Sequence, residues 1–264
     1  MKKYSLSLLA VSISILSITV SCQQKLDKPI ANENEKLIFA TLFVQQAAEY
    51  KALTLQAYNV GQFRLDALLK EAKGNKKLAV VVDIDETVLD NSPFEAKSIL
   101  ENSSYPKYWN EWCNLARAEA IPGAKEFLNY AAEKGVETFY ISNRKIELYE
   151  ATLKNLTEKG FPFADSTHLL MRTSANDKEP RRNLVRENYE IVLLFGDNLG
   201  DFSNVFDDKS TADRAALVEE MKNEFGTKFI VLPNPMYGAW DAALFFDLNV
   251  TNKDSVYKAR LKSF

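Results

Sequence analysis

Short, fully apolar runs alternate along this chain with longer segments whose apolar residues recur at helical spacing. Residues 78–82 and 191–195 contain no polar side chain, which is typical of strands buried on both faces of a parallel sheet. Shorter strand-like runs cover residues 136–141, 168–171 and 229–232. The pattern therefore predicts at least five strands between residues 78 and 232.

The segments between these strands have the composition of helices. We predict helices at 124–134, 146–159 and 212–225, because each segment is followed directly by a glycine, the residue that most often ends a helix. Strands that alternate with helices indicate an α/β fold, in which helices cover both faces of a mostly parallel sheet.

Two regions depart from the alternation. Residues 37–73 contain no proline and one glycine, which predicts a pair of helices broken near Asn59-Val60-Gly61. Residues 93–121 are aromatic and irregular, so we interpret them as an insertion over the sheet. The expected organisation is an N-terminal helical region at 36–75 and a core at 76–264 with its insertion at about 93–121. The helical region and the insertion together would form a small helical cap.

The N-terminus has the layout of an export signal. Lys2 and Lys3 precede an apolar stretch over residues 6–20, which is too short for a confident membrane span. Ser21-Cys22 follows it and resembles a bacterial lipobox, which implies a signal peptide over 1–21 and an acylated Cys22. An ordinary signal peptide with a chance cysteine is the alternative. The polar residues 22–35 would then form a flexible tether to the membrane.

Composition narrows the possible chemistry. The chain has 264 residues with 46% hydrophobic and 26% charged residues, as in an ordinary globular protein. Removing Lys2 and Lys3 from 33 basic residues leaves 31 against 36 acidic ones, a net charge of −5. This acidic balance without a basic tract argues against a nucleic-acid polymer as partner. One histidine and two cysteines exclude histidine-pair phosphatases, His-rich zinc sites and disulfide frameworks.

Polar clusters directly follow or end several of the predicted strands. They are Asp83-Ile84-Asp85-Glu86-Thr87, Ser142-Asn143-Arg144, Gly196-Asp197-Asn198-Leu199-Gly200-Asp201 and Pro233-Asn234-Pro235, and a fifth cluster is Asn176-Asp177-Lys178. Ligands of open α/β sheets bind beyond the carboxyl ends of the strands. We therefore expect these clusters to form one site.

Asp83 and Asp85 are two residues apart, so on an extended chain both side chains project to the same side. Adjacent carboxylates repel unless a cation separates them, which suggests a hard divalent ion. The pair also permits a division of labour in which one carboxylate attacks and one carboxyl group donates a proton. Capping of the next helix is the structural alternative for such a pair. Asp197 and Asp201 after a second buried strand favour the functional interpretation.

Residues 83–91 (DIDETVLDN) resemble the first motif of the haloacid dehalogenase superfamily. With residues 196–202 (GDNLGDF), the chain resembles the class C acid phosphatases, a family of bacterial lipoprotein 5′-nucleotidases. The resemblance extends over nearly the whole mature chain. It implies a haloacid dehalogenase-like, Rossmannoid parallel sheet and a phosphoric monoester hydrolase. Phe94 stands where tyrosine is more usual in this family.

The resemblance also implies roles for single residues. Asp83 would attack phosphorus and become a phosphoaspartate, and Asp85 would protonate the leaving alcohol and then activate water. Mg²⁺ would be held by the carboxylates of Asp83 and Asp197 and by the backbone carbonyl of Asp85, with support from Asp201. An oxygen-only ligand set suits this ion.

The same resemblance places Thr87, Ser142 and Asn143 on the phosphate oxygens and Lys178 beside the phosphoryl group. From charge alone, Lys178 would be interpreted as part of a solvated surface run. Arg144 is open to three interpretations: a helix cap, an ion pair with a nearby carboxylate, or a phosphate contact.

The aromatic residues and the scarce His and Cys carry weaker expectations. Phe94 and Tyr237 lie near motif ends and are candidates for stacking on a nucleobase. Trp109 and Trp112 are three residues apart, so on a helix they share a face, with core packing as the default and substrate contact as the alternative. We expect His168 to be structural and Cys113 to be a small apolar residue.

The sequence thus predicts an exported, Mg²⁺-dependent acid phosphatase, lipid-anchored to the bacterial cell envelope at the outer membrane. Its substrate would be a small phosphomonoester, with nucleoside 5′-monophosphates leading, and the family suggests a homodimer. One alternative is a broad-specificity or sugar-phosphate phosphatase on the same machinery. Another is a surface lipoprotein that binds nucleotides without turnover.

Overall fold

The computed structural model describes residues 34–71, 76–249 and 253–264. The predicted signal peptide, Cys22 and nearly all of the predicted tether lie outside these residues, so their predictions stay as they are. Among the helices of the described ranges, none is both long and apolar enough to span a bilayer.

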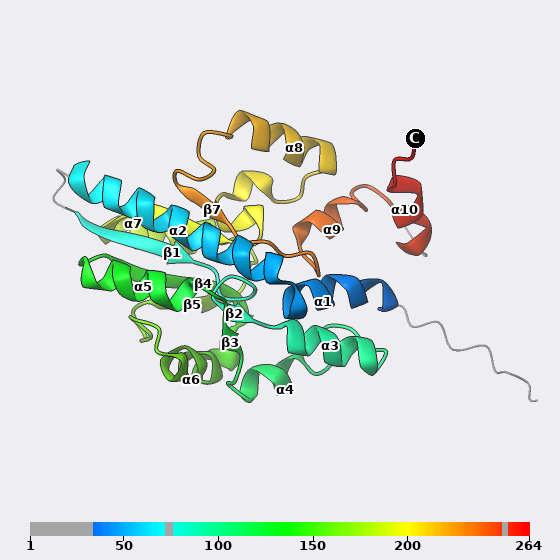
Figure 1. The fold of residues 1–264 in the computed structure, drawn as a ribbon, viewed down its shortest axis with the longest axis horizontal. Coiled ribbons are helices and arrows are strands. Elements are labelled where there is room, and N and C mark those ends of the chain that lie inside the picture. The colour runs from blue at the N-terminus through cyan, green and yellow to red at the C-terminus, as the bar shows by residue number, and fades with distance from the viewer. Residues whose placement is uncertain (1–33, 72–75, 250–252) are drawn as a thin grey trace, which may run out of the picture. The chain divides into compact units, whose positions relative to one another are not determined.

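A five-stranded sheet in the order β5-β4-β1-β6-β7 forms the centre of the fold, and every neighbouring pair is parallel (Figure 1). The strands are β1 (Lys77–Val82), β4 (Glu137–Lys145), β5 (Leu169–Arg172), β6 (Tyr189–Gly196) and β7 (Phe229–Val231). Each coincides with a strand-like run of the sequence, and the predicted α/β fold with a parallel sheet is confirmed.

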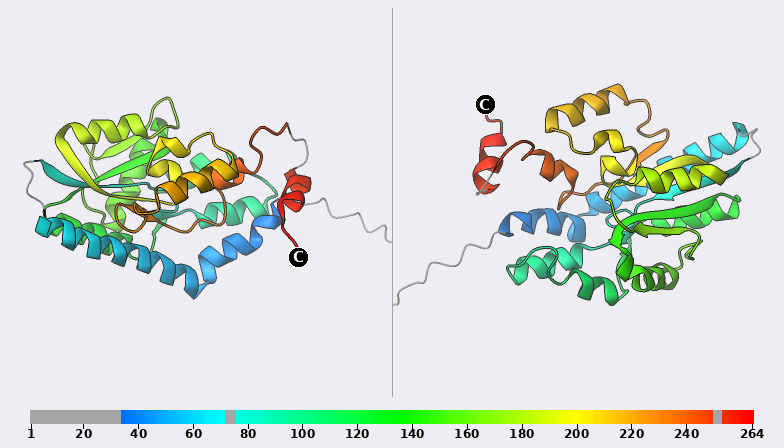
Figure 2. Two further views of the ribbon diagram at one scale, coloured as in Figure 1. Left: turned by 90° about the horizontal axis from the view of Figure 1, so that it is seen from above. Right: turned by 180° about the vertical axis from the view of Figure 1, so that it is seen from behind.

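Helices cover both faces of the sheet, as Figure 2 shows. The main ones are α1 (Ile38–Gln46), α2 (Ala48–Glu71), α5 (Ala124–Glu133), α6 (Tyr149–Lys159), α7 (Glu179–Asn188) and α8 (Thr211–Glu220). Alternate residues of β1 enter the two hydrophobic cores: Val80 and Val82 join the core with α2 and α5, while Ala79 and Val81 join the core with α7. This division is the period-two geometry of a strand buried on both sides.

The predicted break near Gly61 is wrong. Helix α1 ends at Gln46, Ala47 has extended backbone angles, and α2 then runs without interruption through Gly61. A Cβ atom on Gly61 would lie 2.4 Å from Cζ of Phe195 in β6, so the glycine permits the helix to approach the sheet closely. Glycine disfavours a helix interior by about 1 kcal/mol, and close packing against the sheet outweighs that cost here.

The insertion is more regular than its composition suggests. It contains α3 (Ser92–Leu100) and α4 (Trp109–Asn114), and a short antiparallel pair, β2 (Leu89–Asp90) with β3 (Glu119–Ala120), closes its base. Helix α1 packs beside α3, as Figure 1 shows, and together they form a helical cap over one end of the sheet.

Outside the insertion, three α-helices of the described residues were not anticipated from the sequence: α7, α9 (Ala239–Ala243) and α10 (Lys253–Arg260). Helix α7 is dominated by charged residues, and within it only Arg182 and Val185 are buried, so it carries little apolar periodicity. Helix α8 ends at Glu220, five residues before its predicted end, and residues 221–224 continue as turns.

Candidate active site

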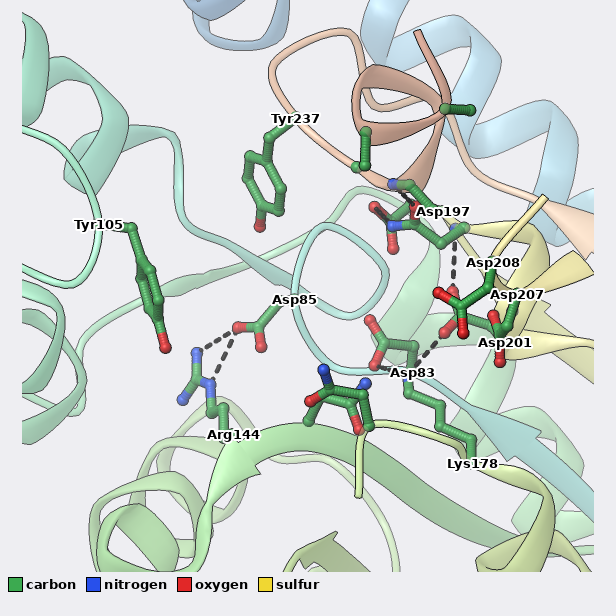
Figure 3. Close-up of a pocket in the computed structure, with 18 of the residues that line it drawn as sticks. Asp83, Asp85, Tyr105, Arg144, Lys178, Asp197, Asp201, Asp207, Asp208 and Tyr237 are labelled. Carbon is green, nitrogen blue, oxygen red and sulfur yellow. Dashed lines mark hydrogen bonds and ion pairs between the residues drawn. The ribbon is translucent and has the colours of Figure 1, made fainter. Parts of the chain in front are cut away.

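A cleft of about 1310 Å³ opens at the carboxyl ends of the strands, between the sheet and the cap (Figure 3). Asp83 follows β1, Asn143 lies near the end of β4, and Asp197 follows β6, and all three line the cleft. The polar clusters of the sequence therefore meet at one edge of the sheet.

Asp83, Asp197 and Asp201 form a compact acidic cluster in which one oxygen from each residue lies within 4.8 Å of the others. Asp201 is fixed by its turn, since its Oδ2 accepts a hydrogen bond of 2.9 Å from the backbone N–H of Asn198. Gly196 makes room for it, because a Cβ there would lie 2.4 Å from Cβ of Asp201. The glycine that ends β6 is thus required by the carboxylate that packs against it.

Lys178, immediately before α7, reaches into this cluster and is only 6% exposed. Its Nζ donates to Asp83 and, at 2.6 Å, to Oδ1 of Asp201. Although burial disfavours its charged form, Asp201 and Asp83 raise the pKa of Lys178 above the ordinary value. Lys178 is therefore a buried, permanently charged partner of two carboxylates and not part of a solvated run.

The positive charge of Lys178 does not balance the negative charge of the three carboxylates. Burial raises the pKa of Asp83 to about 7, against the lowering effect of Lys178 and with a further contribution from Asp201. Burial, Asp201 and Asp83 also raise the pKa of Asp197 well above its usual range. An additional cation would relieve this repulsion, and an all-oxygen donor set of three carboxylates fits a hard divalent ion.

Two amide side chains orient Asp197. Asn198 and Asn234 each donate from Nδ2 to Asp197 Oδ2 at 2.8 Å. Asn234 comes from the Pro233-Asn234-Pro235 cluster, which follows β7. The sequence placed this cluster at the correct edge of the sheet but gave it no role.

Asp85 lines the same cleft but stands apart from the acidic cluster. Oδ1 of Asp85 accepts from Nε of Arg144 at 2.9 Å, from Nη2 of Arg144 at 2.8 Å and from Nδ2 of Asn91 at 2.8 Å. Trp112 Nε1 donates at 2.8 Å to Oδ1 of Asn91 and so braces this network. Of the three interpretations of Arg144, the structure supports the ion pair with a nearby carboxylate.

The predicted phosphate-binding residues are divided. Asn143 lines the cleft, whereas Thr87 and Ser142 have no exposed surface, so their phosphate contacts stay predictions. Arg181, which the sequence analysis did not single out, donates at 2.6 Å to the carbonyl of Ser142 and at 2.6 Å to Oδ1 of Asn143. In the sequence, only the nearness of Lys178 and Pro180 could have pointed to Arg181 as a residue of the site.

Aromatic rings line the cap side of the cleft. Phe94 is 3% exposed and packs edge-on against Trp109 at a centroid distance of 5.0 Å, so it forms wall rather than an open stacking surface. Tyr105 is 57% exposed and was missed by the sequence analysis. Figure 3 shows Tyr105 and Tyr237 on the Asp85 side of the cleft, away from Lys178 and Asp201.

His168 and Cys113 lie outside the cleft lining. His168 is held between Asp165 Oδ1 at 2.8 Å and Glu137 Oε2 at 3.0 Å, at the amino end of the sheet. Cys113 is buried, and burial raises the pKa of its thiol to about 12. Both residues therefore have structural surroundings, as the sequence indicated.

The fold and this edge define an α/β protein whose site combines clustered carboxylates with one buried ammonium group. Over residues 4–240 the chain matches the family described as HAD superfamily, subfamily IIIB (acid phosphatase). The chain belongs to this acid phosphatase family, a group of phosphoric monoester hydrolases.

Solved structures agree with this assignment. The class C acid phosphatase from Bacillus anthracis with tungstate bound is 46% identical, with a TM-score of 0.85, over 88% of this chain and 99% of that one. A second structure of the Bacillus anthracis protein is 47% identical with a TM-score of 0.84, over the same shares of both chains.

A more distant relative is vegetative storage protein 1 of Arabidopsis thaliana, 29% identical over 60% of this chain and 54% of that protein. The stem 31 kDa glycoprotein of Glycine max is 27% identical over 60% of this chain and 58% of that protein. The chain thus spans less than two thirds of the length of these plant relatives.

Proposed function

We propose that this protein is a Mg²⁺-dependent acid phosphatase that hydrolyses phosphate monoesters through a phosphoaspartate on Asp83. The observation that carries the proposal is the buried pair of Lys178 and Asp83 inside an acidic cluster, with a second carboxylate, Asp85, in the same cleft. A site that only binds phosphate has no need of a carboxylate beside the phosphoryl group, because like charges repel. The arrangement therefore favours turnover over mere binding.

In the first step, a carboxylate oxygen of Asp83 attacks phosphorus while the bond from phosphorus to the leaving oxygen breaks. Asp85 gives its proton to the leaving oxygen, so the alcohol departs neutral. In the second step, water attacks phosphorus and Asp85 takes up the proton of that water. The acyl phosphate bond then breaks, which releases phosphate and restores the Asp83 carboxylate.

The remaining residues position these groups and neutralise charge. Lys178 keeps its charge next to Asp83 and offsets the negative phosphoryl oxygens. The fork of Arg144 holds Asp85 on the leaving-group side of the cleft. The carboxylates of Asp83 and Asp197 would hold the metal, with the backbone carbonyl of Asp85 as a further ligand and support from Asp201. When bound, Mg²⁺ supplies charge neutralisation for the carboxylates and the phosphoryl oxygens.

A phosphate-sized anion is supported by the relative with tungstate bound, since tungstate is a tetrahedral oxyanion like phosphate. Nucleoside 5′-monophosphates are our preferred substrates, because Tyr105 and Tyr237 offer aromatic rings on the leaving-group side. Base stacking on an aromatic ring contributes about 1–3 kcal/mol. A sugar-phosphate phosphatase is the alternative, in which the rings would pack against the sugar instead of a base.

The decisive experiment is a phosphate-release panel with nucleotides, sugar phosphates and an aryl phosphate, each assayed with EDTA and after addition of Mg²⁺. We expect EDTA to abolish turnover and Mg²⁺ to restore it. Nucleotides should show the highest kcat/KM, and Tyr237→Ala should reduce that value for nucleotides more than for sugar phosphates. Activity that resists EDTA, or a preference for sugar phosphates, would contradict the corresponding part of the proposal.

We further propose that the mature protein is anchored by lipid on Cys22 to the outer membrane, because Ser21-Cys22 directly follows the apolar stretch. Multiple acyl chains would give stable anchoring, at about 0.8 kcal/mol for each buried methylene. Mass spectrometry of the native protein should detect the lipid, and Cys22→Ser should leave the membrane fraction. An unmodified N-terminal peptide from the wild-type protein would refute the anchor.

A further inference from the structure

Three polar groups lie together at the cap end of the cleft and have no role in the mechanism. Glu95 and Ser98 are one turn apart on α3, and Ser103 follows that helix; all three residues line the cleft. The backbone N–H of Ser103 donates to the carbonyl of Ser98 at 2.8 Å, which keeps the two serines adjacent. The cap thus brings one carboxyl and two hydroxyl groups together in the wall of the cleft.

Within the described residues, these groups have no hydrogen-bond partners. The hydroxyls of Ser98 and Ser103 are buried and have no partner there, and Ser98 as a whole is only 2% exposed. No hydrogen bond or ion pair of the Glu95 carboxylate is found in the same ranges. A buried polar group without a partner is costly, so two such hydroxyls beside a half-buried carboxyl group indicate that something else supplies the missing contacts.

The position of this group relative to Asp85 tells which part of a substrate it meets. Arg144 binds Asp85 and stacks over the ring of Trp109 at 5.6 Å. Trp109 in turn packs against Phe94, the residue before Glu95, and against Tyr105 at a centroid distance of 6.1 Å. This chain of contacts leads from the general acid outward to α3. A leaving group that departs toward Asp85 and extends along these rings would reach Glu95 with its far end.

We propose that Glu95, Ser98 and Ser103 form a specificity subsite that recognises an N–H donor at the end of the leaving group farthest from the phosphate. The fitting ligand class is an aromatic leaving group with an exocyclic amino group next to a ring nitrogen, as in adenine or cytosine nucleotides. This inference rests on the proposed phosphatase function. It adds that the cap selects by hydrogen bonding as well as by stacking.

The carboxyl group of Glu95 suits an amino group that lies next to a ring nitrogen. Burial raises the pKa of the Glu95 carboxyl to about 7, so at acidic pH it is protonated and offers one O–H donor and one carbonyl acceptor. An amino group beside a ring nitrogen presents the complementary acceptor and donor. An acceptor oxygen for the amino group remains in either protonation state.

The test compares adenosine 5′-monophosphate with purine riboside 5′-monophosphate, which differs only in lacking the amino group. The measured quantity is the ratio of their kcat/KM values at acidic pH, with an aryl phosphate as the reference for intact chemistry. In the wild-type protein we expect the ratio to favour the amino compound. Glu95→Leu should reduce that ratio about tenfold, the effect of one hydrogen bond to a buried group, through KM and not kcat.

Glu95→Gln serves as the matched control, because its amide keeps one donor and one acceptor and should retain most of the ratio. Ser98→Ala and Ser103→Ala should each give a smaller loss in the same direction. An unchanged ratio in Glu95→Leu overturns the subsite. An equal loss on the aryl phosphate in Glu95→Leu, together with a lower Tm, also overturns it and assigns Glu95 to cap stability. If the wild-type protein turns over none of the three compounds, it is the phosphatase proposal that fails.

Discussion

The two ends of the parallel sheet differ in how they stabilise carboxylate charge. At the carboxyl end, Asp83, Asp197 and Asp201 crowd together and burial raises the pKa values of Asp83 and Asp197. At the amino end, Glu137 accepts hydrogen bonds from Lys77 at 3.0 Å and Tyr189 at 2.6 Å, with His168 Nε2 at 3.0 Å.

The contrast appears in the protonation of the carboxyl groups. Partial burial alone would raise the pKa of Glu137, but hydrogen bonds from Tyr189, His168 and Lys77 lower it to about 2. The same functional group is therefore stabilised as an anion at one end and destabilised as an anion at the other. A strained cluster at the edge where ligands bind is a signature of function, whereas a satisfied cluster at the opposite edge serves the fold.

The largest effect should come from removing Asp83, the carboxylate that we propose attacks phosphorus, at the carboxyl end. Asp83→Asn keeps the shape of the side chain but abolishes its charge, so turnover should fall by about 10³-fold or more. Steady-state phosphate release measures the loss, and circular dichroism verifies that the fold is intact. Full activity in protein freed of contaminating phosphatase would disprove the role of Asp83.

A smaller but clear effect is expected from the guanidinium fork on Asp85. Arg144→Lys keeps the charge but loses the two-pronged contact, so kcat for an alkyl phosphate should fall by about 10- to 100-fold through misplacement of Asp85. Arg117→Lys is a suitable control, because Arg117 is exposed and lies near Trp112. Equal activities of the two variants would show that the fork does not position the acid.

Stability should respond in the opposite direction to activity at the strained end. The pKa of Asp83 is about 7 in the metal-free fold and about 3.9 in an unfolded chain, so its ionisation destabilises the fold increasingly as pH rises between these values. Asp83→Asn should therefore raise Tm by about 2–4 °C above pH 7, and the gain should vanish near pH 4. Lys178 keeps Asp201 as a partner in this variant.

Thermal melts across pH in EDTA measure this gain. A lower Tm for Asp83→Asn above pH 7 would mean that the pair with Lys178 outweighs the repulsion within the cluster.

The amino end should show the smallest effect, with the opposite sign. The pKa of Glu137 is lowered in the fold, so its ionisation contributes stability above about pH 4.3 that is lost as pH falls toward 2. Because the group lies near the surface, Glu137→Gln should cost about 1 kcal/mol or less at neutral pH. Urea unfolding at neutral and acidic pH measures the difference between variant and wild type. A difference that stays constant down to pH 2 would rule out charge as its origin.

The strands and the catalytic edge could be predicted from the sequence because both depend on local patterns. A fully apolar run such as 191–195 has few alternatives to a buried strand, and polar residues at its end must lie at one edge. Helix α7 could not be recognised in this way, since half of its residues are charged and Val185 is its one buried apolar residue. Tyr105 was missed for another reason: an exposed ring acquires meaning only from what faces it across the cleft.

The wrong prediction of a helix break at Gly61 also comes from a contact that is distant in the sequence. Within its own helix this residue is a weak point, and only the ring of Phe195, 134 positions later, explains it. Long-range packing of this kind has no trace in a local window of sequence.

That contact also governs how the chain can vary. Tyr58, three residues before Gly61, stacks on Phe195 at 5.2 Å and donates at 2.7 Å to the carbonyl of Thr87, in the segment that follows Asp83. Helix α2 therefore supports the segment that begins at Asp83. A larger side chain at position 61 would push α2 away from the sheet and displace the segment that carries Asp83, although position 61 does not line the cleft. A mutational survey would then find intolerant sites on a helix that carries no catalytic group.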